Sequence, residues 1–192
     1  MPERPRFFVD VGSPYAWLAA ERVEAVLPVA PVWEPVLLGA LFAARGSGSW
    51  SLTDAREAGI AEVERRARAR GLPAVRWPEP WPGDMLLAMR AATAAADGGS
   101  ARTFLLVALR SAFVRGRDLS DPAAVADAAS AAGIEGEALL AAAGTPEVKA
   151  ALRERTSEAL ALGVRGVPTV LVGDQAFWGD DQLEAAARAL SV

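Results

Sequence analysis

Residues 7–17 read FFVDVGSPYAW, an apolar strand that ends at a glycine and passes directly into a helix. Ser13 is followed by Pro14, a pairing that favours the start of a helix. A hydroxyl at this position lies among unpaired backbone N–H groups, at the positive end of the helix dipole. The junction is therefore suited to holding an anion, and Ser13 is either an ordinary helix cap or part of a binding site.

The composition narrows the chemistry that the chain can perform. Its 192 residues are 52% hydrophobic, enough for one compact domain or for one domain with a large insertion. The sequence contains no cysteine and no histidine, which excludes a disulfide framework, a thiolate nucleophile of its own and imidazole acid–base catalysis. We expect no metal site, and any chemistry must use hydroxyls, carboxylates, arginines, backbone dipoles or a borrowed group.

Charge and hydropathy give expectations about partners and location. The net charge of −4 argues against nucleic-acid binding. The first residues lead into the strand without the charged and apolar regions of a signal peptide, and no apolar run approaches membrane-spanning length. We therefore expect a cytoplasmic protein with no nucleic-acid or membrane partner.

The two ends of the chain carry the signals of an α/β sheet. A strand over 7–11, a helix over 14–27 and a strand over 29–38 make the opening of such a sheet. Near the C-terminus, a strand over 170–172, a turn at Gly173-Asp174 and a strand that ends at Trp178 predict a β-hairpin, followed by a helix over 180–190.

The middle of the chain is rich in alanine and arginine and has helical periodicity. Within it we predict helices over 54–70, from near Asp84, over 102–114, from Pro122 and over 146–162. The arginines of the first of these helices, Arg66 and Arg70 among them, are interpreted as a solvated face. The predicted architecture is an α/β sheet domain of residues 1–48 and 156–192, with residues 49–155 as a large all-helical insertion.

Tryptophans are assigned to two kinds of place. Trp17, Trp33 and Trp178 are expected in the core, whereas Trp50 and Trp81 are candidates for a pocket wall.

Three short motifs stand at defined places in this architecture: Ser13-Pro14 at the first strand–helix turn, VPT at 167–169 before the hairpin, and GDD at 179–181 before the last helix. Each alone has an ordinary structural explanation, as a helix cap, a strand start or a capped helix. Together with PVLLGALF at 35–42 and GRDLSDP at 116–122, they make the sequence similar to the 2-hydroxychromene-2-carboxylate isomerase and kappa-class glutathione transferase family. That family belongs to the DsbA-like group of the thioredoxin fold, so the resemblance implies a thioredoxin-like sheet with a helical insertion.

The resemblance implies a role for each motif. Ser13 stands where DsbA-like oxidoreductases carry their first cysteine, and as the catalytic residue its hydroxyl would hydrogen-bond the sulfur of bound glutathione and favour the thiolate. Val167, before a cis Pro168, would pair its backbone with the cysteinyl unit. Asp180 and Asp181 would meet the γ-glutamyl end.

The sequence departs from the family pattern at several positions. Ala43 replaces a lysine and Ser47 an asparagine of the glutathione site. The helix near residues 56–60 also lacks a tyrosine and a lysine that the family often has there, and Arg56 would replace the charge of that lysine. The resemblance assigns Ser47 and Arg56 to the cofactor, and the second substrate to Tyr15, Asp84 and Arg90. The implied cofactor is therefore glutathione or another low-molecular-mass thiol.

The function that the resemblance implies is a thiol-dependent isomerase of 2-hydroxychromene-2-carboxylate-like or related conjugated aromatic compounds. Two alternatives stay open: a kappa-like glutathione transferase, and a non-catalytic or rewired thioredoxin-like binding protein of specialised metabolism. A dithiol oxidoreductase is excluded because the chain has no cysteine to form the redox pair. A homodimer is expected by family likeness.

Overall fold

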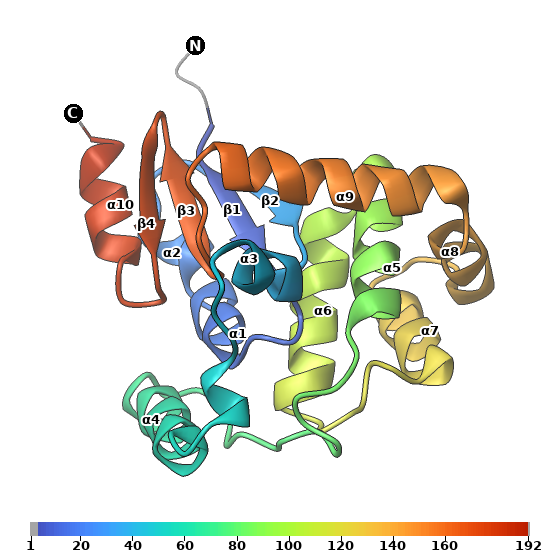
Figure 1. The fold of residues 1–192 in the computed structure, drawn as a ribbon, viewed down its shortest axis with the longest axis horizontal. Coiled ribbons are helices and arrows are strands. Elements are labelled where there is room, and N and C mark those ends of the chain that lie inside the picture. Colours follow the sequence, from blue (N-terminus) through green and yellow to red (C-terminus); the bar gives the residue numbers. More distant parts are fainter. Residues whose placement is uncertain (1–3, 192) are drawn as a thin grey trace.

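The computed structural model describes residues 4–191 and is built around a sheet of four strands (Figure 1). The strand order is β2-β1-β3-β4, made from β1 Arg6–Val9, β2 Val32–Pro35, β3 Thr169–Val172 and β4 Gln175–Trp178. β1 pairs parallel with β2 and antiparallel with β3, and β3 and β4 form the predicted hairpin. The two ends of the chain thus share one sheet, which confirms the predicted fold class.

β1 is buried on both sides of the sheet. Phe7 and Phe8 are neighbours in a strand, so their side chains point to opposite faces, and neither has any exposed surface. Across the parallel pair, the ring of Trp33 meets that of Phe7 edge-on at 4.9 Å between centroids. This explains the continuous apolar run of β1, because both faces of the sheet are covered.

The connection from β1 to β2 differs in detail from the prediction. The expected helix over 14–27 is two helices, α1 Pro14–Ala20 and α2 Val23–Val26, because Arg22 has a non-helical backbone between them. The expected strand over 29–38 is shorter, since β2 ends at Pro35 and only Val36 and Leu37 separate it from α3 Leu38–Ala44. The apolar run at this point suits a buried strand and a buried helix equally, so periodicity alone could not separate them.

A helical block follows, and most of its helices lie on one side of the sheet (Figure 1). Its elements are the short 3₁₀ helix η1 Trp50–Leu52, then α4 Arg56–Ala69, α5 Leu86–Asp97, α6 Ala101–Phe113, α7 Pro122–Ala131, α8 Gly136–Ala143 and α9 Pro146–Ala161. Asp121 and Thr145 cap α7 and α9 as predicted. We did not predict α8, whose cap is Glu135, a residue that is uncommon at that position.

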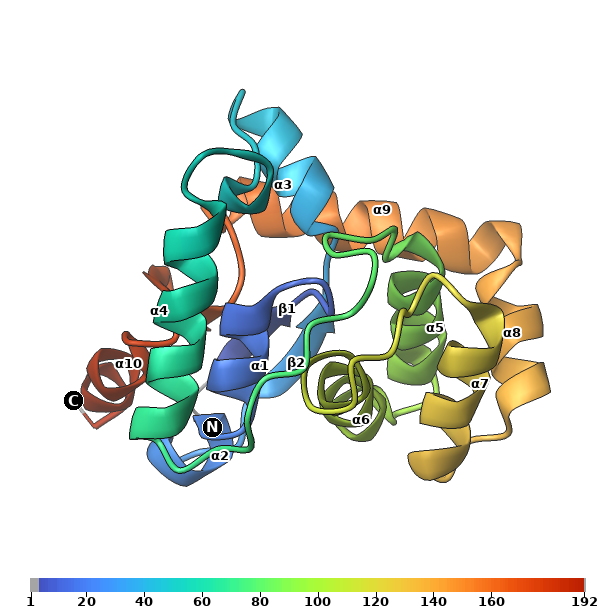
Figure 2. The same ribbon diagram turned by 90° about the horizontal axis from the view of Figure 1, so that it is seen from below.

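Two helices connect the block to the sheet domain. α4 lies away from the other block helices, beside α1 (Figure 2). α9 runs from the block back to the sheet and leads through residues 162–168 into β3 (Figure 1). The proposed boundary between residues 155 and 156 therefore falls inside α9, and the division into two domains stays a prediction.

The chain ends in α10 Leu183–Ala189, which packs on β3 and β4. It begins later than the predicted residue 180, because residues 180–182 form a turn. Among residues 4–191, no helix has the length and hydropathy needed to cross a membrane.

Candidate functional site

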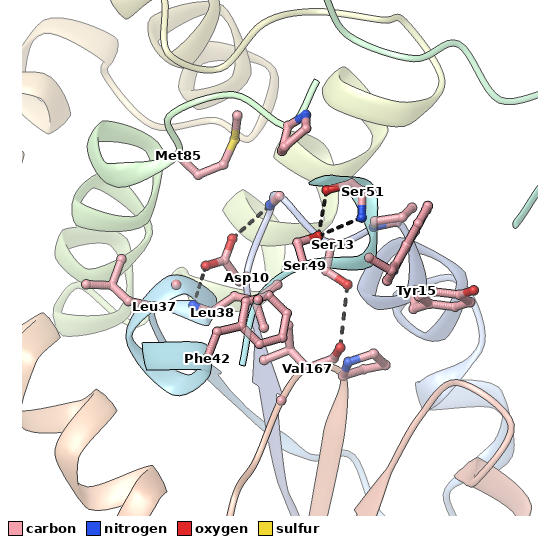
Figure 3. A pocket seen from close by; sticks show the side chains of 18 of the residues that line it. Asp10, Ser13, Tyr15, Leu37, Leu38, Phe42, Ser49, Ser51, Met85 and Val167 are labelled. Atoms are coloured by element: carbon pink, nitrogen blue, oxygen red, sulfur yellow. Dashed lines mark hydrogen bonds between the residues drawn. The ribbon is translucent and has the colours of Figure 1, made fainter. Parts of the chain in front are cut away.

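A cavity of about 1060 Å³ lies where the first strand–helix turn meets the segment before the final hairpin (Figure 3). α3, η1 and the loop at 81–86 form its other walls. The residues predicted for the site that line it are Ser13, Tyr15, Ser47, Asp84, Val167, Pro168, Asp180 and Asp181. Segments that are far apart in the sequence therefore build one pocket.

Ser13 is both a helix cap and part of the cavity lining. It is only 4% exposed, and its Oγ accepts a hydrogen bond of 3.2 Å from the backbone N–H of Ala16, which caps α1. The same hydroxyl donates a long hydrogen bond of 3.5 Å to the carbonyl oxygen of Val167 (Figure 3). Because that bond is long, the hydroxyl proton can be redirected to a better acceptor in the cavity.

The segment opposite Ser13 is a bend that leads into β3 and is held by hydrogen bonds. The peptide bond between Val167 and Pro168 is cis, as expected. The carbonyl of Pro168 accepts from the N–H of Gly179 at 2.9 Å, and the hydroxyl of Thr169 donates to the carbonyl of Gly166 at 2.7 Å. The Val167 backbone is therefore placed at the cavity by bonds on both sides of it.

The prediction that Trp178 lies in the core is wrong. It lies on the edge strand β4 and is 49% exposed, and it lines the cavity. The guanidinium of Arg45 lies 5.0 Å from its ring centre. A Cβ at Gly166 would come within 2.7 Å of the indole nitrogen, so only glycine allows this close contact.

Asp180 is paired with two arginines of α4. Its carboxylate is 1% exposed; it forms an ion pair of 2.6 Å with Arg66 and a second ion pair with Arg70. Arg66 also binds Glu62 at 2.6 Å, so the cluster holds charges of both signs. The predicted solvated face is therefore wrong for Arg66 and Arg70. Asp180 lines the cavity with its charge already compensated, whereas the neighbouring Asp181 is exposed there.

Tyr15, Asp84 and Ser47 line the cavity, and each makes a different contact with the protein. The guanidinium of Arg66 lies 5.5 Å from the centre of the Tyr15 ring, and burial raises the pKa of the phenol. Asp84 Oδ1 accepts a 2.8 Å hydrogen bond from Leu86 N, at the start of α5. Ser47 Oγ donates to the carbonyl of Phe42 at 3.4 Å.

Arg56 and Arg90 are not among the residues that line the cavity. Arg56 donates to the carbonyl of Ser51 at 3.2 Å, and its guanidinium lies 5.1 Å from the ring centre of Trp81, which does line the cavity. Arg56 therefore contacts a residue of the cavity wall without lining the cavity itself. Arg90 lies within α5 and is half-buried.

Trp50 and Trp81 form an aromatic wall, as predicted. Their ring centres are 5.3 Å apart, and Trp77 continues the cluster at 4.4 Å from Trp81. A Cβ at Gly59 would lie 2.2 Å from the Trp50 ring, so this glycine lets α4 pack against the wall. The indole of Trp81 donates to the carbonyl of Gly12 at 3.4 Å, which ties the wall to the turn that carries Ser13. Such a wall fits a flat apolar group.

Asp10 is a cavity residue that sequence reasoning missed. It is 4% exposed and lies three residues before Ser13, at the end of β1. Its Oδ1 accepts from the N–H of Gly12 at 2.8 Å and its Oδ2 from the N–H of Leu38 at 2.7 Å (Figure 3). Burial raises the pKa of this carboxyl to about 6, against the two backbone hydrogen bonds that lower it. The available signal was an aspartate that interrupts an apolar strand.

Comparison with known families decides where the chain belongs. The sequence profile of the DSBA-like thioredoxin domain matches residues 6–191, nearly the whole chain. The chain belongs to the DSBA-like thioredoxin domain family. No curated protein matches its sequence.

Solved structures share the fold of this DSBA-like domain at low sequence identity. A 2-hydroxychromene-2-carboxylate isomerase superposes with a TM-score of 0.85 at 20% identity, over 98% of this chain and 95% of the other. A probable DsbA oxidoreductase from Streptomyces coelicolor gives 0.73 at 22% identity, over 98% and 90%. The cytosolic disulfide reductase DsbM from Pseudomonas aeruginosa, solved with GSH, gives 0.66 at 15% identity, over 98% and 99%.

This DSBA-like domain has no cysteine in its sequence, so it cannot exchange a disulfide of its own. Within residues 4–191, no group of three or more histidine, cysteine, aspartate or glutamate side chains is placed to hold a metal ion. The chemistry that the cavity offers is a buried hydroxyl, the backbone of the segment before β3, carboxylates and an aromatic wall.

Proposed function

We propose that the protein binds a low-molecular-mass thiol with its sulfur against Ser13, and uses it to isomerise 2-hydroxychromene-2-carboxylate-like or related conjugated aromatic compounds. The observation that carries the proposal is the position of the Ser13 hydroxyl. It is buried at the N-cap of α1, opposite Val167, in a large cavity of a chain that has no thiol of its own.

Ser13 would stabilise the thiolate form of the bound thiol. Its Oγ keeps accepting the capping N–H of Ala16 while its proton turns from the Val167 carbonyl to the sulfur. A hydrogen bond to the charged form of a group lowers its pKa, so more of the thiol is ionised at neutral pH. The backbone of Val167 would pair with the backbone of the thiol compound, as one extended strand pairs with another.

The thiolate would act as a nucleophile that is recovered unchanged. It adds to one carbon of a conjugated double bond, and the electron pair of that bond moves onto the conjugated carbonyl. The former double bond can then rotate. When the electron pair returns, the carbon–sulfur bond breaks and the double bond forms again in the other geometry. The wall of Trp50 and Trp81 would hold the aromatic part of the substrate.

A kappa-like glutathione transferase is the second candidate, because the same cavity could release the thiol adduct as product. A third candidate is a protein whose site takes a thiol other than glutathione, or binds one without catalysis. Asp180, which the family resemblance assigns to the γ-glutamyl end, is committed to Arg66 and Arg70. This pairing favours a site rewired for a different thiol, or one that binds without catalysis. Asp181, Ser47 and the Val167 backbone remain for the thiol compound.

The proposal is tested by incubating the protein with glutathione and a hydroxychromene carboxylate, and following absorbance. We expect turnover by the wild type and its loss in Ser13→Ala. Ser130→Ala serves as the control, because Ser130 is exposed on α7 and does not line the cavity. Absence of turnover by the wild type with glutathione and with each of the other thiols titrated below, or full turnover by Ser13→Ala, rejects the isomerase role.

Calorimetric titration separates the candidates for the thiol. Glutathione, cysteine and other low-molecular-mass thiols are titrated separately into the wild type. Tight binding of glutathione supports the glutathione site, whereas tight binding of another thiol with absent binding of glutathione supports the rewired site.

A further inference from the structure

Asp10 contacts the two walls of the cavity that meet at the end of β1. One carboxylate oxygen takes the N–H of Gly12, in the turn that carries Ser13, and the other takes the N–H of Leu38, the first residue of α3 (Figure 3). The backbone carbonyl of Asp10 also accepts from the N–H of Ser13 at 3.1 Å. One residue thus connects the serine turn to the opposite helix.

Methionine side chains pack against the turn that Asp10 holds. A Cβ at Gly12 would lie 2.9 Å from the Met85 side chain and 3.3 Å from Asp10 Oδ1. The N–H of Val11 points to the sulfur of Met89 at 3.4 Å. Gly12 and Leu38 are half-buried, and among the described residues the carboxylate of Asp10 is the hydrogen-bond partner of both N–H groups.

We propose that Asp10 is a positioning residue for the thiol site, whose ionised carboxylate holds the Ser13 turn and the start of α3 together. The thiol in this statement rests on the function proposed above; the connection between the two walls does not.

The protonation state of Asp10 decides whether both walls are held. A carboxylate offers an acceptor on each oxygen, whereas a protonated carboxyl has a hydroxyl on one of them. That hydroxyl would face an N–H, donor against donor, so one of the two hydrogen bonds is lost. Because the pKa of Asp10 is raised to about 6, this loss falls in the range between pH 5 and pH 7.

Other charged groups do not compensate Asp10. Within the described residues no arginine forms an ion pair with it, and burial is the main cause of its raised pKa. No charged side chain stands at the start of α3, where the N–H of Leu37 donates to the hydroxyl of Thr156 of α9 at 3.1 Å. The residue of α5 that contacts the turn after Asp10 is the uncharged Met89. The other titratable or charged side chains that line the cavity are Tyr15, Arg45, Arg66, Asp84, Asp180 and Asp181.

The connection is tested first without any ligand. Backbone amide resonances of the wild type are followed by NMR from pH 5 to pH 8. We expect the amides of Gly12 and Leu38 to shift together with a shared midpoint near pH 6. The amide of Ala123, which Asp121 caps at an exposed helix start, serves as the reference and should not share that midpoint.

Asp10→Asn then tests the positioning role. Asparagine has one oxygen and one NH₂ group, so it resembles the protonated acid at every pH. Glutathione and cysteine are the probes, titrated at pH 5.5 and pH 8. At pH 8 we expect the variant to bind more weakly by about tenfold, the loss of one hydrogen bond to a charged group. At pH 5.5, where about three-quarters of Asp10 is protonated, the difference should shrink to about threefold. Asp121→Asn, which changes a matching cap far from the cavity, should follow the wild type at both pH values.

The two experiments have separate outcomes for the connection between the walls, for the positioning role of Asp10 and for the proposed function. Failure of Gly12 and Leu38 to shift together between pH 5 and pH 7 overturns the connection, and equal thiol affinity of wild type and Asp10→Asn at pH 8 overturns the positioning role. Absence of thiol binding by the wild type rejects the proposed function instead, while the ligand-free titration still decides whether Asp10 joins the two walls.

Discussion

The Ser13 hydroxyl and the Val167 carbonyl oxygen are 3.5 Å apart although 154 residues separate them in the sequence. Ser13 begins the first helix, and Val167 precedes the last two strands. The contact exists because β1 and β3 are neighbours in the sheet. The cavity therefore forms only when both ends of the chain are in place.

The two roles of Ser13 can be separated by comparing two substitutions. Ser13→Ala removes the cap of α1 and should lower the free energy of unfolding by about 1 kcal/mol. Ser13→Gly should cost only a few tenths of that, because glycine is tolerated at N-cap positions. Both lack the hydroxyl and should lose activity equally. Denaturant unfolding together with the absorbance assay checks this, and activity that follows stability would argue against a chemical role.

Asp10 should make the fold less stable as the pH rises. Its pKa is raised in the folded state to about 6 from an ordinary value of 3.8, so between these values the folded protein binds more protons than the unfolded chain. The stabilising contribution is fully present below about pH 4 and is lost as the pH rises through 6. Relative to Asp10→Asn, the free energy of unfolding of the wild type should fall by about 2 kcal/mol between pH 4 and pH 7.

Urea unfolding of both proteins at several pH values gives this difference directly. Other carboxylates titrate in the same range, but they are common to both proteins and cancel. A difference that stays constant with pH, or rises with it, would contradict the raised pKa of Asp10.

The pairing of Asp180 with Arg66 and Arg70 should be important for stability. Asp180→Asn removes the carboxylate that pairs with two partly buried guanidinium groups, of which Arg66 keeps Glu62 as a partner, and we expect a loss of about 3 kcal/mol in the free energy of unfolding. Asp181→Asn is the matched control for stability, because the carboxylate of Asp181 is exposed. This substitution should change the free energy of unfolding by less than about 0.5 kcal/mol. Equal effects of the two substitutions would mean that the buried ion pairs contribute little.

Two glycine-to-alanine substitutions should change the free energy of unfolding in opposite directions. At Gly59 the new methyl group would meet the Trp50 ring at 2.2 Å, and overpacking of this kind costs about 1–3 kcal/mol. At Gly39 in α3 a Cβ meets nothing within 4 Å, so the higher helix propensity of alanine should stabilise by up to about 1 kcal/mol. Thermal unfolding checks both, and tryptophan fluorescence should change only in Gly59→Ala.

The local parts of the fold could be predicted from the sequence. Ser13-Pro14, Asp121-Pro122 and Thr145-Pro146 each begin a helix, because a capping side chain and a proline act within one turn. The hairpin followed from Gly173-Asp174 between two apolar runs. α8 was missed because its cap, Glu135, is not a residue that usually marks a helix start.

The missing parts of the site depend on contacts that have no local signal. Arg66 and Asp180 are 114 residues apart, and the periodicity of α4 could not reveal that its arginines face an aspartate before α10. Asp10 belongs to an apolar strand, and its partner Leu38 was assigned to the end of a strand instead of the start of α3. Trp178 was assigned to the core because the sequence does not show that β4 is an edge strand.

The strand order also determines when the protein can complete its fold during synthesis. β1 is an inner strand, and its second neighbour, β3, is synthesised only after the whole helical block that separates them. Until then, the apolar side chains of β1 lack one side of their sheet, while the intervening helices can already pack on one another through local contacts. A nascent chain released before β3 should therefore expose β1, and be a better substrate for chaperones than the finished protein.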